Sequence, residues 1–122
     1  MGAANRRGDD GRAAEALAEG HLRAHGLAIV ERNVHSRHGE LDIVAREGAT
    51  IVFVEVRLRR PGTFGDAADS ITAAKRARLI AAAREYLARL PRTPPCRFDV
   101  VLLDRLDPAR VVWVRDAFGE EE

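Results

Sequence analysis

The sequence predicts one α/β domain in which a mixed five-stranded sheet is flanked by two helices. Its 122 residues fall in the range of about 100–150 that single domains most often span. Helical and strand patterns follow one another in the order α-β-β-β-α-β-β. A helix between two strands indicates a right-handed crossover that joins parallel strands, whereas the first three strands predict an antiparallel meander.

The domain is expected to span residues 1–122 without an internal repeat. Residues 1–9 and 119–122 are predicted to be disordered tails, because the first stretch is polar and the second ends in three glutamates. A first helix is predicted from Asp10 to His25, where apolar residues recur at helical spacing and Gly26 provides a stop. Glu15 lies at the edge of its apolar stripe.

Three strand patterns follow, at residues 27–34, 40–46 and 50–58. The third is the strongest, because it contains the run Ile51-Val52-Phe53-Val54-Glu55-Val56. Glu47, Gly48 and Ala49 predict a hairpin turn between the second and third strands.

The second half of the chain predicts one helix and two strands. Pro61 and two glycines exclude regular structure from residues 59–65. The helix is expected from Thr72, a good N-cap, to Leu90, before Pro91. The two strands are Arg97–Leu103 and Arg110–Val114.

Composition excludes several classes of protein. A single cysteine, Cys96, rules out an internal disulfide framework and a cysteine-rich zinc site. No apolar run resembles a signal peptide or approaches the roughly 18 residues of a membrane span. We therefore expect a soluble, cytoplasmic protein without a membrane partner.

Charge is unevenly distributed along the chain, although the net charge is +1. Residues 57–97 carry ten basic and three acidic side chains, whereas the flanking segments are acidic. Such a basic segment is typical of a surface that binds a polyanion, and equally of a solvated helix face. Of the 20 basic residues, 19 are Arg and one is Lys75.

Glu55 is the strand carboxylate that fits an exposed position least well. Every other residue in the run 51–56 is apolar, which indicates a buried side chain. An ionised carboxylate there costs several kcal/mol unless a cation pairs with it or a metal binds it. Arg57 shares its strand face, and Glu40 and Asp42 share one face of the preceding strand.

The length of the intervening turn decides whether these groups meet, because directly opposite residues point to the same side of a sheet. A four-residue turn (47–50) places Asp42 opposite Glu55. A two-residue turn (47–48) places Glu40 opposite Glu55. A three-residue turn sends Asp42 and Glu55 to opposite faces.

Carboxylates that meet in this way need a counter-ion. A hard divalent cation such as Mg²⁺ prefers oxygen ligands, and a bound metal activates water and stabilises the leaving oxygen in phosphodiester cleavage. An exposed ion pair between Glu55 and Arg57 gathers the same residue types without a metal, so both interpretations stay open.

Several segments together resemble the UPF0102 (YraN-like) family of bacterial proteins. They are Gly39–Ala45, Phe53–Arg57, Phe64-Gly65, Lys75 and Arg97–Val101, with Glu15 and the Glu31-Arg32-Asn33 segment in support. The resemblance covers about residues 10–118. This family is similar in turn to the restriction-endonuclease-like fold, closest to archaeal Holliday junction resolvases. That fold has an αβββαβ core, and its signature is an acidic residue followed on the next strand by Glu-x-Lys.

The resemblance implies a role for each matching acidic residue. Asp42 and Glu55 are the expected ligands of Mg²⁺ or Mn²⁺, with the backbone carbonyl of Val56 as a third ligand. Glu15 matches a helix-one glutamate that approaches the site. Glu40 lies next to the site and is expected to support it.

Two basic residues match the resembled fold differently. Lys75 corresponds to a basic residue at the start of the second helix that faces the substrate phosphates. Arg57 stands where the pattern has a lysine that positions and helps activate the attacking water. Arginine, with a pKa above about 12, cannot act as a base. The departure puts catalysis in question but leaves nucleic-acid binding unaffected.

Three functions are compatible with these residues. The first is a Mg²⁺- or Mn²⁺-dependent endonuclease on branched, flapped or single-stranded DNA, with a catalytic site of Asp42, Glu55, Arg57, Glu15 and Glu40. Salt-dependent, sequence-independent contacts to the nucleic-acid backbone are then expected from Arg59, Arg60, Lys75, Arg76 and Arg78. The second is a catalytically impaired DNA-binding module. The third is a protein-interaction or assembly domain, such as a homodimer through the edge strand Arg110–Val114.

Overall fold

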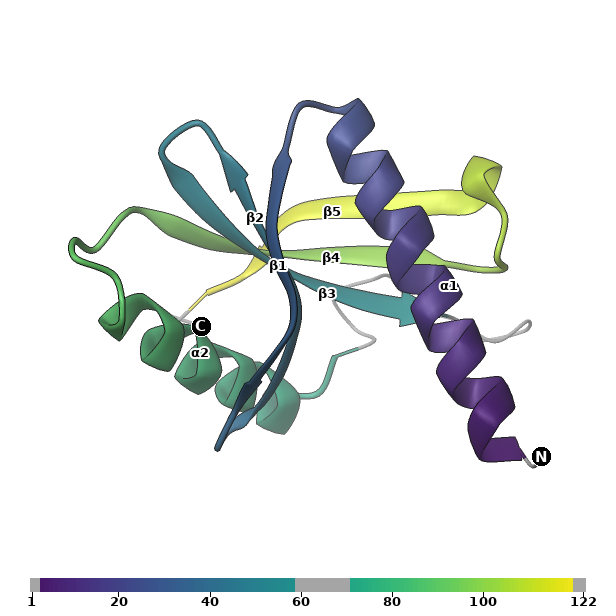
Figure 1. Cartoon of the computed structure of the whole chain (residues 1–122), viewed down its shortest axis with the longest axis horizontal. Helices are drawn as coiled ribbons and strands as arrows, with labels where there is room; N and C mark the ends of the chain where they lie inside the picture. Colours follow the sequence, from purple (N-terminus) through teal and green to yellow (C-terminus); the bar gives the residue numbers. More distant parts are fainter. Residues whose placement is uncertain (1–2, 59–70, 120–122) are drawn as a thin grey trace.

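The computed structural model describes residues 3–58 and 71–119, with side chains from residue 10 onward. Two helices and five strands follow one another in the predicted order (Figure 1). The elements are α1 (Ala3–Ala24), β1 (Ala28–Ser36), β2 (Gly39–Glu47), β3 (Thr50–Leu58), α2 (Ala73–Ala88), β4 (Cys96–Leu103), a 3₁₀ turn (Pro108–Arg110) and β5 (Val111–Phe118). No helix among these residues is long and apolar enough to cross a membrane.

The five strands form one mixed sheet in the order β1-β2-β3-β4-β5. Strands β1, β2 and β3 pair antiparallel, β3 and β4 pair parallel, and β5 returns antiparallel to β4. The parallel pair is joined through α2, because parallel neighbours need a crossover connection. The predicted α/β class with two helices and a five-stranded mixed sheet is therefore confirmed.

Two apolar cores lie on opposite faces of this sheet. Apolar residues of α1 pack on one face against β2, β3 and β4. The helix contributes Ala14, Ala18 and Leu22, and the strands contribute Ile43, Ala45, Val52, Val54, Val101 and Leu103. The other face packs against α2 and carries an aromatic row. Phe53, Phe98 and Phe118 stack across β3, β4 and β5 with centroid separations of 5.5 and 4.9 Å. The two helices thus enclose β3 from both sides (Figure 1).

Helix α1 begins seven residues earlier than predicted, at Ala3 and not at Asp10. Residues 3–9 were expected to belong to a disordered tail on their polarity, but Ala and Arg are strong helix formers and extend the helix. Its C-terminus fits the prediction. Gly26, at φ +94°, occupies the left-handed position, and the Leu27 N–H donates to the Leu22 carbonyl as in a Schellman motif.

Helix α2 is capped as predicted, since the Thr72 side chain accepts a hydrogen bond from the Lys75 backbone N–H at 3.1 Å. This cap fixes where the helix begins and which residues form its first turn. The helix ends at Ala88, two residues before the predicted Leu90.

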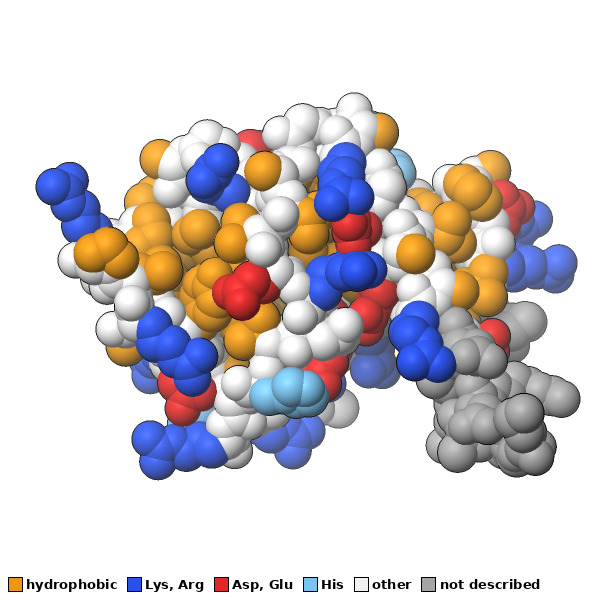
Figure 2. Space-filling view, in the orientation of Figure 1, with side chains coloured by type: hydrophobic (Ala, Val, Ile, Leu, Met, Phe, Trp, Pro, Cys, Tyr) orange, Lys and Arg blue, Asp and Glu red, His pale blue; other side chains and the backbone are white. Residues whose placement is uncertain are grey.

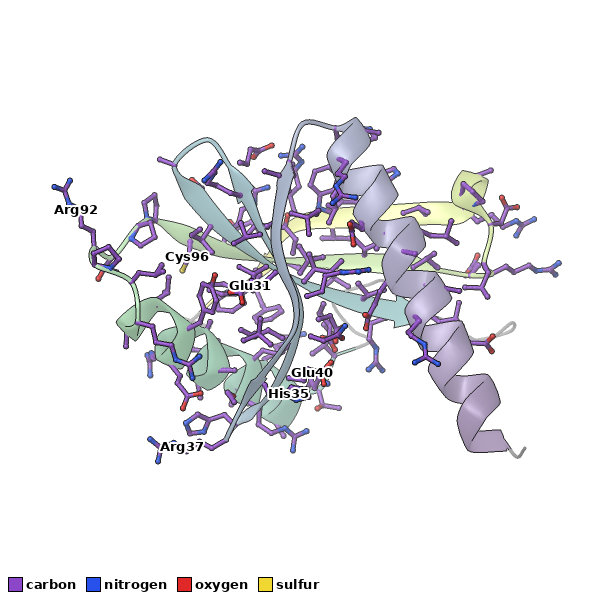
Figure 3. All side chains as sticks on the ribbon, in the orientation of Figure 1. Glu31, His35, Arg37, Glu40, Arg92 and Cys96 are labelled. Atoms are coloured by element: carbon purple, nitrogen blue, oxygen red, sulfur yellow. The ribbon has the colours of Figure 1, made fainter. Side chains whose placement is uncertain are left out.

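The β1–β2 hairpin projects past the other strands and contacts both helices. On the α1 side, Glu19 pairs with Arg32 at 3.1 Å. On the α2 side, Arg37 at the hairpin tip pairs with Glu85 at 3.4 Å (Figure 3). The hairpin is therefore held between α1 and α2.

Strand β5 runs four residues beyond the predicted end at Val114, and the buried Asp99 of β4 explains the extension. The Asp99 carboxylate is fully buried and accepts hydrogen bonds from Arg97, from the Trp113 indole at 2.9 Å and from the Asp116 backbone N–H at 2.9 Å. Asp116 has φ +52°, at an irregularity in the β4–β5 register. The sequence pattern did not predict the extension, because the hydrogen bonds that hold it join β5 to Asp99 on another strand.

We expect Asp99→Ala to lower the free energy of unfolding by about 3 kcal/mol, because it leaves buried donors of Arg97 and Trp113 without their acceptor. Urea unfolding followed by circular dichroism measures the change. Asp107→Ala is the control. It removes an exposed cap of the 3₁₀ turn and should cost no more than about 1 kcal/mol. Equal losses of unfolding free energy in the two variants would contradict the structural role assigned to Asp99.

Candidate functional site

The register of the β2–β3 hairpin brings Asp42 and Glu55 to corresponding positions. Glu47 pairs with Thr50, and the ladder continues without a shift to Ile43 opposite Val54. The next position along this register places Asp42 beside Glu55. Of the three turn lengths considered, the structure therefore has the four-residue turn from Glu47 to Thr50.

Beyond the Ile43–Val54 pair, the Asp42 side chain takes the place of a backbone acceptor between β2 and β3. Its Oδ2 accepts a hydrogen bond from the Val56 backbone N–H at 2.9 Å. This bond ties the end of the β2–β3 pairing to the carboxylate itself and fixes its position against β3. The half-buried Asp42 side chain thus lies between the two strands, where it approaches Glu55.

Glu55 is the buried carboxylate that the apolar run predicted, at 4 % exposure. Its Oε2 lies 3.3 Å from the Lys75 ammonium of α2. Its Oε1 is also buried, and no donor among the described residues reaches it. A small cavity of about 10 Å³ adjoins Glu55 and Asp42 and is lined by apolar side chains, including Phe53 and Phe98. Glu55 therefore has one oxygen paired with an ammonium and one that no donor among the described residues reaches.

Besides Glu55, two further carboxylates, those of Glu15 and Glu40, lie close to Asp42. One carboxylate oxygen from each of the three residues lies within 4.8 Å of those of the other two. Glu15 comes from α1 and Glu40 from β2, beside His35 at 3.5 Å (Figure 3). The structure thus brings together all four acidic residues of the predicted site, with Asp42 linking Glu55 to the other two.

Asn33 of β1 belongs to the same site, although the sequence assigned it no role. With its amide nitrogen turned toward the carboxylates, Asn33 donates to Glu40 Oε1 at 2.7 Å and to Glu15 Oε1 at 3.1 Å. It adopts the left-handed conformation at φ +53°. Asn is among the few residues with a side chain that tolerate this conformation. An Asn within a strand pattern is therefore the one sequence signal that could have indicated an irregular backbone at this position.

Burial and mutual repulsion raise the pKa of two of these carboxyl groups. Desolvation is the largest cause at Glu55 and raises its pKa to about 8. The Asp42 charge and a hydrogen bond that protonated Glu55 donates to Asp42 add to the rise, whereas Lys75 opposes it. The pKa of Glu15 is also raised, first by burial and then by Asp42 and Glu40, against the Asn33 hydrogen bond. The site therefore attracts a proton or another cation.

The two basic residues of the predicted site differ in their contacts. Arg57 is exposed and makes no ion pair with another described residue. Lys75, expected to face substrate phosphates, contacts Glu55 inside the site. The alternative of an exposed Glu55–Arg57 ion pair is therefore wrong, because Glu55 is buried and pairs with Lys75.

The other residues predicted to contact nucleic acid do not form one patch in the part of the chain that is described. Arg59 and Arg60 lie outside the described residues. On α2, Arg78 is exposed, whereas Arg76 is half-buried over the Phe118 ring at 5.9 Å. Figure 2 shows basic side chains interspersed with acidic ones on the face that it presents. Nucleic-acid binding by these residues stays a prediction.

The donor set fits a hard divalent cation. All four acidic side chains offer oxygen, the ligand that Mg²⁺ and Mn²⁺ prefer. The buried Glu55 Oε1 without a donor is the observation that favours a cation, since a buried polar atom is normally paired. Asp42 shares a cluster of carboxylate oxygens with Glu15 and Glu40 and also lies close to Glu55, so these four side chains are the candidate ligands.

Comparison with known proteins assigns the chain to a protein family but gives no activity. The model described as "Uncharacterised protein family UPF0102" matches residues 14–103. A UPF0102 protein of Methylobacillus flagellatus is 52 % identical over 112 residues, which cover 92 % of this chain and 96 % of that protein. UPF0102 proteins of Nitrosococcus oceani and Pseudomonas aeruginosa are each 50 % identical, over 93 % and 90 % of this chain and 94 % and 92 % of their own lengths.

We expect Asn33→Gly to destabilise the metal-free protein by about 1 kcal/mol, because the bridge between Glu15 and Glu40 is lost while glycine keeps the left-handed backbone. Asp116→Gly is a matched control. It sits at φ +52° away from the site, and its backbone N–H still bonds to Asp99. Urea unfolding in a chelator compares the two, and equal stabilities of Asn33→Gly and the unsubstituted protein would refute the bridge.

Stability of the metal-free protein should fall as pH rises between the ordinary Glu value of 4.5 and about 8. In that range the folded protein, with protonated Glu55, binds more protons than the unfolded chain, so the free energy of unfolding decreases with pH. Glu55→Gln removes this titration and should flatten the dependence. Urea unfolding at about pH 5, 6.5 and 8 measures both proteins. Parallel pH profiles for the two would exclude Glu55 as the cause.

Proposed function

The chain belongs to the uncharacterised protein family UPF0102, and from its site we propose that it is a Mg²⁺- or Mn²⁺-dependent endonuclease acting on branched, flapped or single-stranded DNA. One observation carries the proposal. A buried Glu55 has an oxygen that no donor among the described residues reaches, and it lies close to Asp42, whose carboxylate also clusters with those of Glu15 and Glu40. Four carboxylates and one ammonium in this arrangement favour a bound cation over a structural ion-pair network.

The residues of the site divide the work of phosphodiester hydrolysis between them. Asp42 and Glu55 would hold the metal, with the Val56 carbonyl as a further ligand. A divalent cation supplies an activated water and charge for the leaving oxygen. Glu15 and Glu40 would then orient water at the same centre. Asp42 is pre-oriented for this role because the Val56 N–H already fixes one of its oxygens.

Contacts to the DNA backbone are assigned to basic side chains around the site. Arg57 is exposed at the end of β3, two residues beyond Glu55, where its charge can meet a phosphate. Arg78 is exposed on α2, and Arg59 and Arg60 follow β3 in the sequence. Such contacts are sequence-independent, and the described residues contain no helix that presents a row of base-reading side chains. The proposed specificity is therefore for DNA structure.

Arg57 also supports a second candidate function, a DNA-binding module with impaired cleavage. Arginine at this position cannot accept a proton from water, and its side chain is exposed. This candidate shares the DNA contacts of the first. It differs in that binding would not depend on Asp42 or on a divalent cation.

Cleavage assays distinguish the two functions. With Mn²⁺, we expect the purified protein to cleave a branched or flapped DNA substrate and Asp42→Asn to lower the rate at least about 100-fold, because a ligand is lost. Asp107→Asn, an exposed acid of the 3₁₀ turn, should keep full activity. Salt-sensitive binding that survives both Asp42→Asn and a chelator, without cleavage, would favour the impaired module. No binding and no cleavage would refute both.

A further inference from the structure

Lys75 occupies a defined position at the start of α2. It is the third residue of the helix, and its backbone N–H is held by the Thr72 cap at 3.1 Å. From there the side chain crosses to β3 and places its ammonium 3.3 Å from Glu55 Oε2. The Lys75 side chain remains 36 % exposed, whereas that of Glu55 is 4 % exposed. The ammonium therefore lies at the boundary between the buried carboxylate and solvent.

The contact gives the two oxygens of Glu55 different surroundings. Oε2 is paired with the ammonium, and Oε1 has no donor within the described structure. A carboxylate held at one oxygen cannot rotate freely, so the ammonium also fixes the direction of Oε1, and Asp42 lies close to the same carboxylate. This is how a residue outside the ligand set orients a ligand.

The residue type suits this role. Lysine carries a compact point charge with three donors on a flexible stem, whereas arginine has a planar fork that needs a wider partner. Lys75 is the single lysine among 20 basic residues. Arg57, at the position that the Glu-x-Lys pattern gives to lysine, is exposed and makes no ion pair with another described residue.

We propose that Lys75 is the positioning lysine of the site, which orients Glu55 toward the bound cation from helix α2, and that Arg57 is left to contact the DNA backbone. The inference rests on the proposed function, since it assigns a residue to the same metal centre. It differs from the pattern of the resembled fold, in which the lysine lies on the strand of the second carboxylate. The competing account is that the ammonium merely fills the place of a cation.

Mn²⁺ titration calorimetry on the DNA-free protein separates these accounts. We expect Lys75→Met to weaken Mn²⁺ binding about tenfold, because Glu55 loses its orienting partner. Arg57→Met should leave Mn²⁺ affinity unchanged, as should Arg105→Met, an exposed arginine outside the site. Tighter Mn²⁺ binding by Lys75→Met would overturn the proposal, because the ammonium would then compete with the cation. Unchanged affinity would overturn it as well.

Steady-state cleavage adds a second readout. Lys75→Met should lower kcat at saturating Mn²⁺ about 100-fold with little change in KM for DNA, whereas Arg57→Met should raise KM and weaken its salt dependence. Lys75→Arg keeps the charge and guards against a folding defect in Lys75→Met. It should still bind Mn²⁺ several-fold more weakly, and wild-type behaviour of Lys75→Arg would overturn the requirement for lysine.

The two proposals fail in different ways. If the unsubstituted protein binds Mn²⁺ and Asp42→Asn abolishes that binding, the metal centre is supported whatever the Lys75 variants do. Insensitivity of Mn²⁺ affinity to the Lys75 substitutions would then refute the positioning role alone. If the unsubstituted protein binds no Mn²⁺, both proposals are wrong.

Discussion

Burial of the Glu55 carboxylate is the constraint on which the rest of the site depends. The residue lies on the central strand β3, beside the aromatic row that packs under α2. Water is excluded there, so the charge must be balanced by protein groups or by a cation. Lys75, in the first turn of α2, supplies one such group, because its ammonium reaches Glu55.

A second consequence is the accumulation of negative charge at one end of the β2–β3 ladder. Asp42 takes the place of a backbone rung, and Glu40 and Glu15 approach it from β2 and α1. Asn33 offsets part of the repulsion by donating to Glu15 and Glu40. Such a cluster is costly for stability alone, whereas a pre-assembled set of oxygen ligands is what a divalent cation needs.

The carboxylate of Asp99, on the neighbouring strand, is neutralised completely. Asp99 on β4 is as buried as Glu55, but each of its oxygens accepts hydrogen bonds from Arg97 and from the β5 strand. The contrast separates a fully paired carboxylate from the one that the proposed function uses, within a single sheet. Asp99 holds β5 in place, whereas one oxygen of Glu55 accepts from no donor among the described residues.

Much of this structure could be predicted from local patterns. The order of helices and strands, the Thr72 cap and the burial of Glu55 all follow from periodicity and residue type over a few neighbouring positions. These features depend on interactions between residues close in sequence, or on the apolar face that each element must bury. The alternation of the strands allowed Asp42 or Glu40 to meet Glu55, and the family resemblance added Glu15 to this group.

Tertiary structure decided what depends on distances between elements. The sequence left three turn lengths open, and the pairing of Glu47 with Thr50 selected the one that joins Asp42 to Glu55. The meeting of Lys75 with Glu55 depends on how the crossover places α2 against β3, which no local pattern records. The same holds for Asn33, whose bridge requires α1 and the hairpin to be in place. By itself, the sequence determined the helices and strands and the residue types of the candidate site. Packing decided which side chains meet, because contacts between residues distant in sequence are set by the whole core.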